Sequence, residues 1–237
     1  MKKKIKIAHL YYDLMNLYGE NGNIRALENF IARQGFDAYT DRLTIKDKID
    51  FKKYDIYYLG AGSEENELLV IADLLPYKED IKTAIEDGKM FLVTGNAMEI
   101  FGREIYIPGT ENIECLGIFN YTSVYGFGRL VGEVQYEFAG LPLDKGRHIV
   151  GFKNCNSQIV ENDGELLFGT SDSFRQNNFF AMNFIGPILI RNPYFTDYLL
   201  SILFEELHEV YVADSSTCEY KAYHEYVKNF VEPLNLD

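Results

Sequence analysis

Residues 92–102 (LVTGNAMEIFG) have the order of apolar and small residues that is typical of a turn presenting a catalytic nucleophile. We expect an apolar strand to run into a tight turn of small residues and then directly into a helix. This is the layout of a nucleophile elbow, which exposes one side chain at the end of a sheet in a strained backbone conformation. The alternative is an ordinary strand-to-helix connection, which any α/β fold contains.

The expected turn contains no evident nucleophile. Its residues Gly95, Asn96 and Ala97 carry neither a thiol nor a hydroxyl group. Thr94 lies one position earlier, on the strand, where we expect its hydroxyl to point to a different face. A nucleophile would also need a proton acceptor and hydrogen-bond donors for the oxyanion. The turn therefore has the shape of an elbow and lacks the group that would use it.

The three cysteines are scattered along the chain and show neither metal-ligand spacing nor a pairing pattern: Cys115, Cys155 and Cys218. An odd number of cysteines in a chain without a recognisable targeting segment is typical of reduced thiols. We therefore predict a cytoplasmic protein, and we expect neither a metal nor a cofactor.

The histidines do not identify a catalytic base either. His9 belongs to the first expected strand and could approach a crevice at the sheet edge, although packing in the core or at the edge is the favoured interpretation. The others have no evident partner nearby in the sequence, and we interpret them as surface residues: His148, His208 and His224.

The composition limits the possible partners. The 237 residues carry a net charge of −13 and are 47% hydrophobic, which is enough for a sizeable core. An acidic surface repels phosphate backbones, so we expect no nucleic-acid partner. No apolar run approaches the roughly 20 residues that span a bilayer, and Lys6 and His9 interrupt the apolar residues near the start. We therefore predict neither a signal peptide nor insertion into a membrane.

The first half of the chain alternates apolar runs with amphipathic helical patterns. We expect strands at residues 5–12, from residue 38, and at 55–59 and 90–93, with helices at 24–33, 65–75 and 78–87. Such alternation predicts an α/β fold, a mostly parallel sheet with helices on both faces. Ligand sites in such sheets lie beyond the carboxyl ends of the strands. The loops that follow three of the strands should therefore open onto one crevice: residues 16–23, 60–62 and 94–97.

The second half of the chain is β-rich. Short segments typical of antiparallel strands occur at residues 105–107, 129–138, 148–153 and 165–168, and a helical pattern returns at 195–208. The chain closes with apolar residues at helical spacing, which we expect to dock on its own core: Tyr220, Tyr223, Val227 and Phe230. We predict one domain over residues 1–212 with a C-terminal helical extension over 213–237. Because Tyr makes up 18 residues, we also expect many tyrosines exposed for interfaces.

An ordered series of short motifs resembles the class I glutamine amidotransferases. The motifs are residues 16–24 (NLYGENGNI), 60–64 (GAGSE), 84–88 (AIEDG), 128–132 (GRLVG), 151–154 (GFKN), 186–189 (GPIL), 192–193 (NP) and 197–200 (DYLL). The series spans about residues 5–205. It is similar to the branch that includes the glutaminase subunit of lipid II isoglutaminyl synthase and the cobyric acid synthase amidotransferase domains. The resemblance implies a flavodoxin-like sheet.

The resemblance also implies a chemistry. In that family a cysteine at the elbow attacks the side-chain amide of glutamine, and a histidine near the chain end assists. The oxyanion donors would be backbone N–H groups of Gly60, Ala61 and Gly62 and of Asn96, the residue after the cysteine position. Arg129 matches the arginine that holds glutamine, with a surface ion pair as the alternative. The ammonia passes to a Mur-type ligase, which amidates a cell-wall peptide carboxylate.

This chain departs from the family at both catalytic positions. The elbow reads cysteine, any residue, glycine, any residue, glutamine in the family, and Gly95-Asn96-Ala97-Met98-Glu99 here. The family's histidine precedes the glycine-proline pair, where this chain has Ile185. Glycine adopts a positive φ freely, so we expect the elbow backbone to persist without the chemistry. We therefore predict a positive φ at Gly95 and Ile185 within side-chain reach of it.

Three hypotheses follow for the function. The first is a catalytically silent amidotransferase-like subunit that binds a Mur-type ligase as a scaffold or regulator. The second is a module that binds glutamine or a related amino acid through Arg129. The third is an active enzyme with another nucleophile, for which Cys155 is the candidate, because it follows Asn154 where the family often has histidine. The alternative for Cys155 is a small buried apolar side chain.

Overall fold

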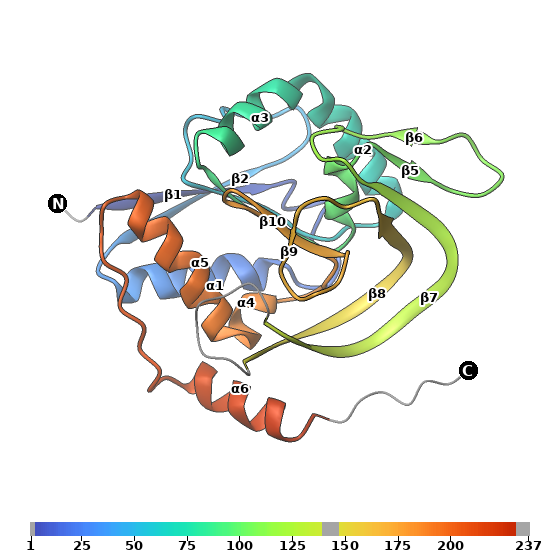
Figure 1. The fold of residues 1–237 in the computed structure, drawn as a ribbon. Helices are drawn as coiled ribbons and strands as arrows, with labels where there is room; N and C mark the ends of the chain where they lie inside the picture. The colour runs from blue at the N-terminus through green and yellow to red at the C-terminus, as the bar shows by residue number, and fades with distance from the viewer. Residues whose placement is uncertain (1–2, 139–146, 231–237) are drawn as a thin grey trace.

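The computed structural model describes residues 3–138 and 147–230. Its largest sheet has seven strands in the order β2-β1-β3-β4-β11-β10-β9 (Figure 1). Neighbours from β2 to β11 are parallel, and β10 and β9 are antiparallel additions at one edge. The strands are β1 (Lys4–Leu10), β2 (Asp37–Leu43), β3 (Ile56–Leu59), β4 (Met90–Thr94), β9 (Glu165–Leu166), β10 (Ser173–Gln176) and β11 (Phe179–Met182). The predicted mostly parallel α/β sheet is confirmed.

Helices cover both faces of this sheet (Figure 1). On one face, α2 (Glu64–Leu74) and α3 (Lys78–Glu86) contribute Val70 and Ile81 to one hydrophobic cluster. On the other, α1 (Asn21–Arg33) and α5 (Pro193–Glu206) pack in a second cluster. The remaining helical segments are η1 (Leu75–Tyr77), η2 (Gly95–Phe101), α4 (Ile188–Arg191) and α6 (Cys218–Lys228).

The two central strands β3 and β4 are buried along their whole length. Successive side chains alternate between the two faces. Tyr57 and Phe91 therefore join the cluster beneath α2 and α3, while Tyr58 and Leu92 join the cluster beneath α1 and α5. Burial on both faces explains why these strands read as continuous apolar runs rather than as an alternating pattern.

The β-rich second half contributes strands to both sheets. A four-stranded sheet has the order β6-β5-β7-β8 and contains β5 (Glu104–Tyr106), β6 (Ile113–Glu114), β7 (Thr122–Glu137) and β8 (His148–Val160). The antiparallel pairing of β7 with β8 is as predicted, whereas β5 pairs parallel with β7. The sequence interpretation missed β11, a parallel strand of the main sheet that leads into Ile185. Its four residues are buried, so they lack an amphipathic pattern.

The terminal helix α6 docks on the body of the chain, as expected. Tyr220 and Tyr223 are buried, and their hydroxyls donate to the Asp197 carboxylate and to the His148 carbonyl oxygen, the latter at 2.6 Å. Val227 and Phe230 are only partly buried, so the apolar stripe is not covered along its whole length. Residues 231–237 of the predicted extension lie outside the described residues.

The expectation of many exposed tyrosines is wrong for much of the described chain. Tyr11, Tyr57, Tyr58 and Tyr121 are among the largest fully buried side chains. Their hydroxyls find partners inside the protein; the Tyr58 hydroxyl, for example, accepts from the Asn23 amide at 2.8 Å. Tyrosine therefore serves here as a core aromatic residue with a satisfied polar end.

Residues 3–138 and 147–230 contain neither a membrane-spanning helix nor a cluster of metal-ligating side chains. None of the helices there is long and apolar enough to cross a membrane. The same residues contain no group of three or more His, Cys, Asp or Glu side chains that could hold a metal ion.

Candidate functional site

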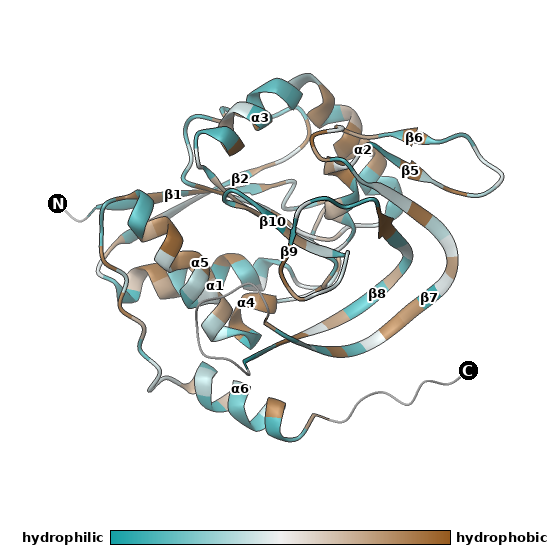
Figure 2. Cartoon of the chain, viewed as in Figure 1, coloured by the Kyte–Doolittle hydropathy of each residue, from teal (hydrophilic) through white to brown (hydrophobic). Residues whose placement is uncertain are grey.

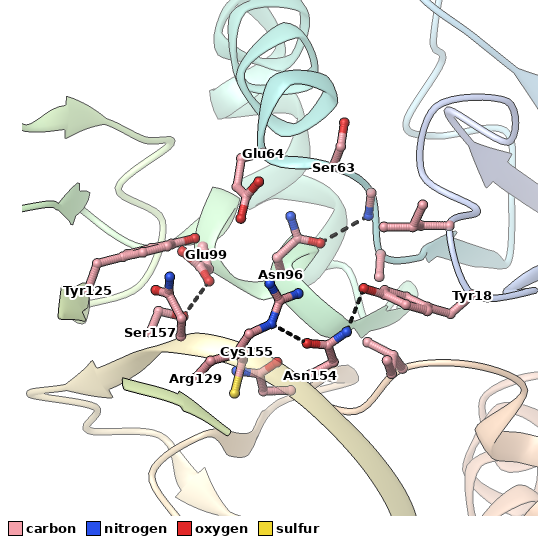
Figure 3. A pocket seen from close by; sticks show the side chains of 16 residues that line it. Tyr18, Ser63, Glu64, Asn96, Glu99, Tyr125, Arg129, Asn154, Cys155 and Ser157 are labelled. Atoms are coloured by element: carbon pink, nitrogen blue, oxygen red, sulfur yellow. Dashed lines mark hydrogen bonds between the residues drawn. The ribbon is translucent and has the colours of Figure 1, made fainter. Parts of the chain in front are cut away.

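The three predicted loops do converge on one crevice, beyond the carboxyl ends of the parallel strands. The crevice has a volume of about 160 Å³. Loop residues Tyr18, Gly62 and Asn96 line it on one side, and Arg129 and Ser157 of the β7–β8 ribbon line it on the other (Figure 3). The site therefore lies between the two sheets.

The elbow at the end of β4 has the predicted backbone. Gly95 has φ +66°, directly after the extended residue Thr94. Thr94 is fully buried, and its hydroxyl lies 3.0 Å from that of Tyr58, so it is not available as a nucleophile. The expected helix follows directly, as the 3₁₀ helix η2.

The nucleophile position is filled by apolar groups. A Cβ added to Gly95 would lie 2.6 Å from Cβ of Ala61 and 3.2 Å from Cγ2 of Ile185. The first distance is too short for two carbon atoms without a shift. The predicted proximity of Ile185 to Gly95 is therefore confirmed. Ile185 is held there because its N–H donates to the Phe152 carbonyl oxygen of β8 at 3.0 Å.

The loop that would supply oxyanion donors is occupied by a side chain of the elbow. Gly62 N–H donates to Oδ1 of Asn96 at 3.0 Å. Nδ2 of Asn96 in turn donates to the Glu67 carboxylate at 2.9 Å. An oxyanion site works through donors aimed at developing charge. Here one such donor already has an acceptor.

Glu20 holds together the loops around the site. It belongs to the motif of residues 16–24, but its role was not predicted from the sequence. Its fully buried carboxylate accepts from the N–H groups of Tyr18 at 2.8 Å and Gly186 at 3.2 Å. A Cβ at Gly60 would lie 2.4 Å from Cγ of Glu20, so only glycine fits there. Burial raises the pKa of Glu20, and these backbone donors oppose the rise. Glu20 thus ties the loops of residues 16–23 and 60–62 to the segment after Ile185.

Two buried carboxyl groups, Glu67 and Glu99, lie beneath the elbow. Each is 2% exposed. Burial, and next the charge of Glu99, hold the pKa of Glu67 well above its usual value. Burial raises the pKa of Glu99 to about 7, although the Ser157 hydroxyl donates to it at 2.6 Å. Glu99 stands where the family has glutamine, and its pairing with Glu67 was not predicted from the sequence. Because both pKa values are raised, the Glu67–Glu99 pair holds a proton near neutral pH.

Arg129 faces the crevice from an irregular stretch of β7. The pairing with β8 shifts between Tyr125 and Leu130, and Gly126 and Gly128 in this stretch have φ +108° and φ +89°. Nε of Arg129 donates to Oδ1 of Asn154 at 2.7 Å. Asn154 donates onward to the Tyr18 hydroxyl at 2.9 Å (Figure 3). The irregularity therefore aims a cation into the site, a common role of β-bulges.

The alternative nucleophiles and bases are poorly placed. Cys155 is half-buried and lines the crevice, but burial raises the pKa of its thiol. Cys115 is buried, and Cys218 is exposed on α6. His9 is fully buried, and burial lowers its pKa to about 4, so it is neutral at physiological pH.

The surface interpretation of the other histidines holds in part. His208 and His224 are exposed, and the His224 ring lies 2.9 Å from the Tyr194 hydroxyl. His148 is half-buried beneath α6.

The comparisons with known proteins agree with this geometry. A family model for CobB/CobQ-like glutamine amidotransferase domains matches residues 6–188, so the chain belongs to that family. A relative from Staphylococcus aureus (strain N315) is 28% identical over 207 residues, covering 83% of each chain. A second, from Streptococcus pneumoniae (strain ATCC BAA-255 / R6), is 28% identical over 202 residues, covering 80% of this chain and 76% of the relative. Both are named lipid II isoglutaminyl synthase (glutamine-hydrolyzing) subunit GatD.

A solved structure shares the fold. The crystal structure of a glutamine amidotransferase has a TM-score of 0.55 and 18% identity, covering 83% of this chain and 98% of that one. The predicted class I glutamine amidotransferase-like fold is confirmed.

Proposed function

We propose that the chain is a catalytically silent amidotransferase-like subunit that binds a Mur-type ligase in cell-wall peptide amidation. The observation that carries the proposal is the filled elbow. Gly95 has no side chain, and Ala61 and Ile185 occupy the space that a nucleophile and its base would need. Acyl transfer from glutamine requires a nucleophile, a proton acceptor and free oxyanion donors. Ammonia release from glutamine by the purified chain tests the loss of hydrolysis.

The part of the proposal that concerns a partner rests on the subunit names of the relatives and on one apolar surface. Phe127, Leu130 and Val131 of β7 are 60%, 52% and 56% exposed. They flank Arg129, so the surface adjoins the crevice, and Figure 2 shows hydrophobic bands along β7. Apolar groups gathered beside a functional crevice are typical of an interaction site. A ligase docked there would lie next to the crevice.

A tagged chain purified from its native cells tests this surface. Leu130→Asp and Val131→Asp should each abolish recovery of a protein with Mur-ligase sequence motifs. Val210→Asp is the matched control, because Val210 is 81% exposed and the segment after α5 runs on the opposite side of the molecule from β7 (Figure 1). Recovery of no ligase, or equal recovery with all variants, would contradict the partner proposal.

The second candidate is an amino-acid binding module. It is favoured by the Arg129–Asn154–Tyr18 chain of hydrogen bonds, which presents a cation in the crevice. Such a cation suits the carboxylate of an amino acid. A thermal shift with glutamine in the absence of any ligase would support this candidate. The third hypothesis, catalysis by Cys155, is disfavoured because a raised pKa leaves little thiolate.

A further inference from the structure

We infer that the carboxamide of Asn96 is an internal stand-in for a substrate amide and that it closes the oxyanion site to external carboxamides. Its oxygen accepts from Gly62 N–H at 3.0 Å (Figure 3). Its nitrogen donates to Glu67 at 2.9 Å. Both ends of a primary amide are thus held, the oxygen by a residue that lines the crevice and the nitrogen by a buried carboxyl group. The inference rests on the proposed function, because it says what fills a site that has lost its nucleophile.

The donor at Gly62 is fixed independently of Asn96. A Cβ at Gly62 would lie 2.4 Å from Sδ of Met15, so the loop packs tightly on residues 14–15. Leu17 N–H donates to the Ala61 carbonyl oxygen at 3.0 Å, and the Asn66 amide donates to the Leu14 carbonyl oxygen at 2.9 Å. These contacts hold the Gly62 N–H in place before any ligand arrives. A preorganised donor of this kind binds whichever acceptor reaches it.

The acceptor at Glu67 is fixed as well. Glu67 belongs to the first turn of α2 and is 2% exposed. Its second carboxyl oxygen, Oε1, has no hydrogen-bond partner among the described residues. A buried carboxyl group without donors is costly, so the bond from Asn96 is valuable to the fold. Removal of Asn96 would leave two complementary groups free, an N–H donor and a carboxyl acceptor.

These two groups together select a primary carboxamide. A carboxamide offers an oxygen to Gly62 N–H and an N–H to the Glu67 oxygen that now accepts from Asn96. Arg129 lies in the same crevice and suits the α-carboxylate of an amino acid. L-glutamine therefore fits the emptied site. Asn96 is itself half-buried and lines the crevice, so the space it vacates can be reached from solvent.

Calorimetric titration of L-glutamine and L-norleucine tests the inference. The protein is compared with Asn96→Ala and with Asn156→Ala, which removes another, exposed asparagine from the same crevice. Asn96→Ala should bind L-glutamine at least about 10-fold more tightly than the unmodified chain, the effect of roughly one hydrogen bond. Norleucine affinity and the Asn156→Ala variant should show no such gain. Equal affinity of the Asn96→Ala and unmodified proteins for glutamine, or no binding by either, would overturn the inference.

A measurement on the unmodified protein covers the case in which Asn96→Ala does not fold. The Gly62 amide proton should exchange slowly with solvent, and the Asn96 side-chain NH₂ signals should stay unchanged as millimolar L-glutamine is added. Displacement of those signals by glutamine would mean that the site is open, against the inference. The calorimetric and NMR experiments both measure glutamine binding. A result against the inference would therefore not decide whether the chain hydrolyses glutamine, which ammonia release tests separately.

Discussion

Cβ of Ala61 lies 2.6 Å from the position that a Cβ at Gly95 would take. Ile185 bounds the same space, with its Cγ2 at 3.2 Å. The elbow glycine has φ +66°, a conformation that costs a residue with a Cβ about 1–3 kcal/mol. The turn is thus fitted to glycine both in its backbone and in its surroundings.

Gly95→Ala should lower the free energy of unfolding through both effects. We expect a loss of about 2–5 kcal/mol from strain and overpacking together. Gly35→Ala is the matched control, because Gly35 has φ +83° with no atom within 4 Å of an added Cβ. Urea denaturation of both variants separates the steric part from the backbone part.

Ala61→Gly should recover most of the steric part in the double variant with Gly95→Ala, since it removes the clashing atom. The coupling between the two substitutions should be at least about 1 kcal/mol. Additive effects would mean that Ala61 does not limit the elbow.

Restoring the chemistry should require several substitutions at once. Gly95→Cys with Ile185→His supplies a thiol and a base, and Ala61→Gly supplies room for the thiol. We expect a trace of glutamine turnover only when Asn96→Ala is added to these three substitutions and frees the Gly62 N–H. No single substitution should give turnover, because nucleophile and base act as a unit. Ammonia release from matched protein preparations is the measurement. Activity in Ile185→His alone would contradict the requirement for a thiol at residue 95.

Glu99→Gln should change how stability depends on pH. Burial raises the pKa of Glu99 from 4.5 to about 7. The protonated form is therefore favoured in the fold, and its stabilisation is present below about pH 4.5 and is lost as the pH rises through about 7. Glutamine mimics the protonated form, so the variant should be more stable than the unmodified protein at pH 7.5, by about 1–3 kcal/mol.

Urea denaturation between pH 4.5 and 7.5 measures this difference, which should shrink toward pH 4.5. The side chains that interact with Glu99 are Glu67, Glu64, Ser157, Ser123 and Tyr125. Both proteins keep all of them, so only the charge of residue 99 differs. Glu65→Gln, on the exposed side of α2, is the control. Parallel stability curves for Glu99→Gln and the unmodified chain would show that the pair holds no extra proton.

Deletion of residues 215–237 should lower the melting temperature. The deletion removes the buried Tyr220 and Tyr223 and the bond from Tyr220 to Asp197. Lys221→Ala, at an exposed position of the same helix, should have little effect. An unchanged melting temperature with loss of partner binding would instead assign α6 to the partner.

The sequence was sufficient for the backbone of the site. The order of the motifs placed three loops at one sheet edge, and the turn after β4 predicted the positive φ of Gly95. It was insufficient for contacts between side chains on distant loops. The hydrogen bonds of Asn96 with Gly62 and Glu67 join segments about 30 residues apart, and they form only because the fold packs those segments within a few ångströms of each other. The burial of tyrosines such as Tyr121 likewise depends on internal acceptors, here the Met98 carbonyl oxygen, that no local pattern reveals.

Ammonia release from glutamine by the unmodified protein tests the central claim most directly. The assay is run on the chain alone and with its ligase, after purification steps that remove contaminating glutaminase, with Cys155→Ala in parallel. We predict no turnover above the protein-free rate, because no acyl-enzyme can form without a thiolate at the elbow. Turnover that persists through purification would contradict the account, and its loss in Cys155→Ala would identify Cys155 as the nucleophile.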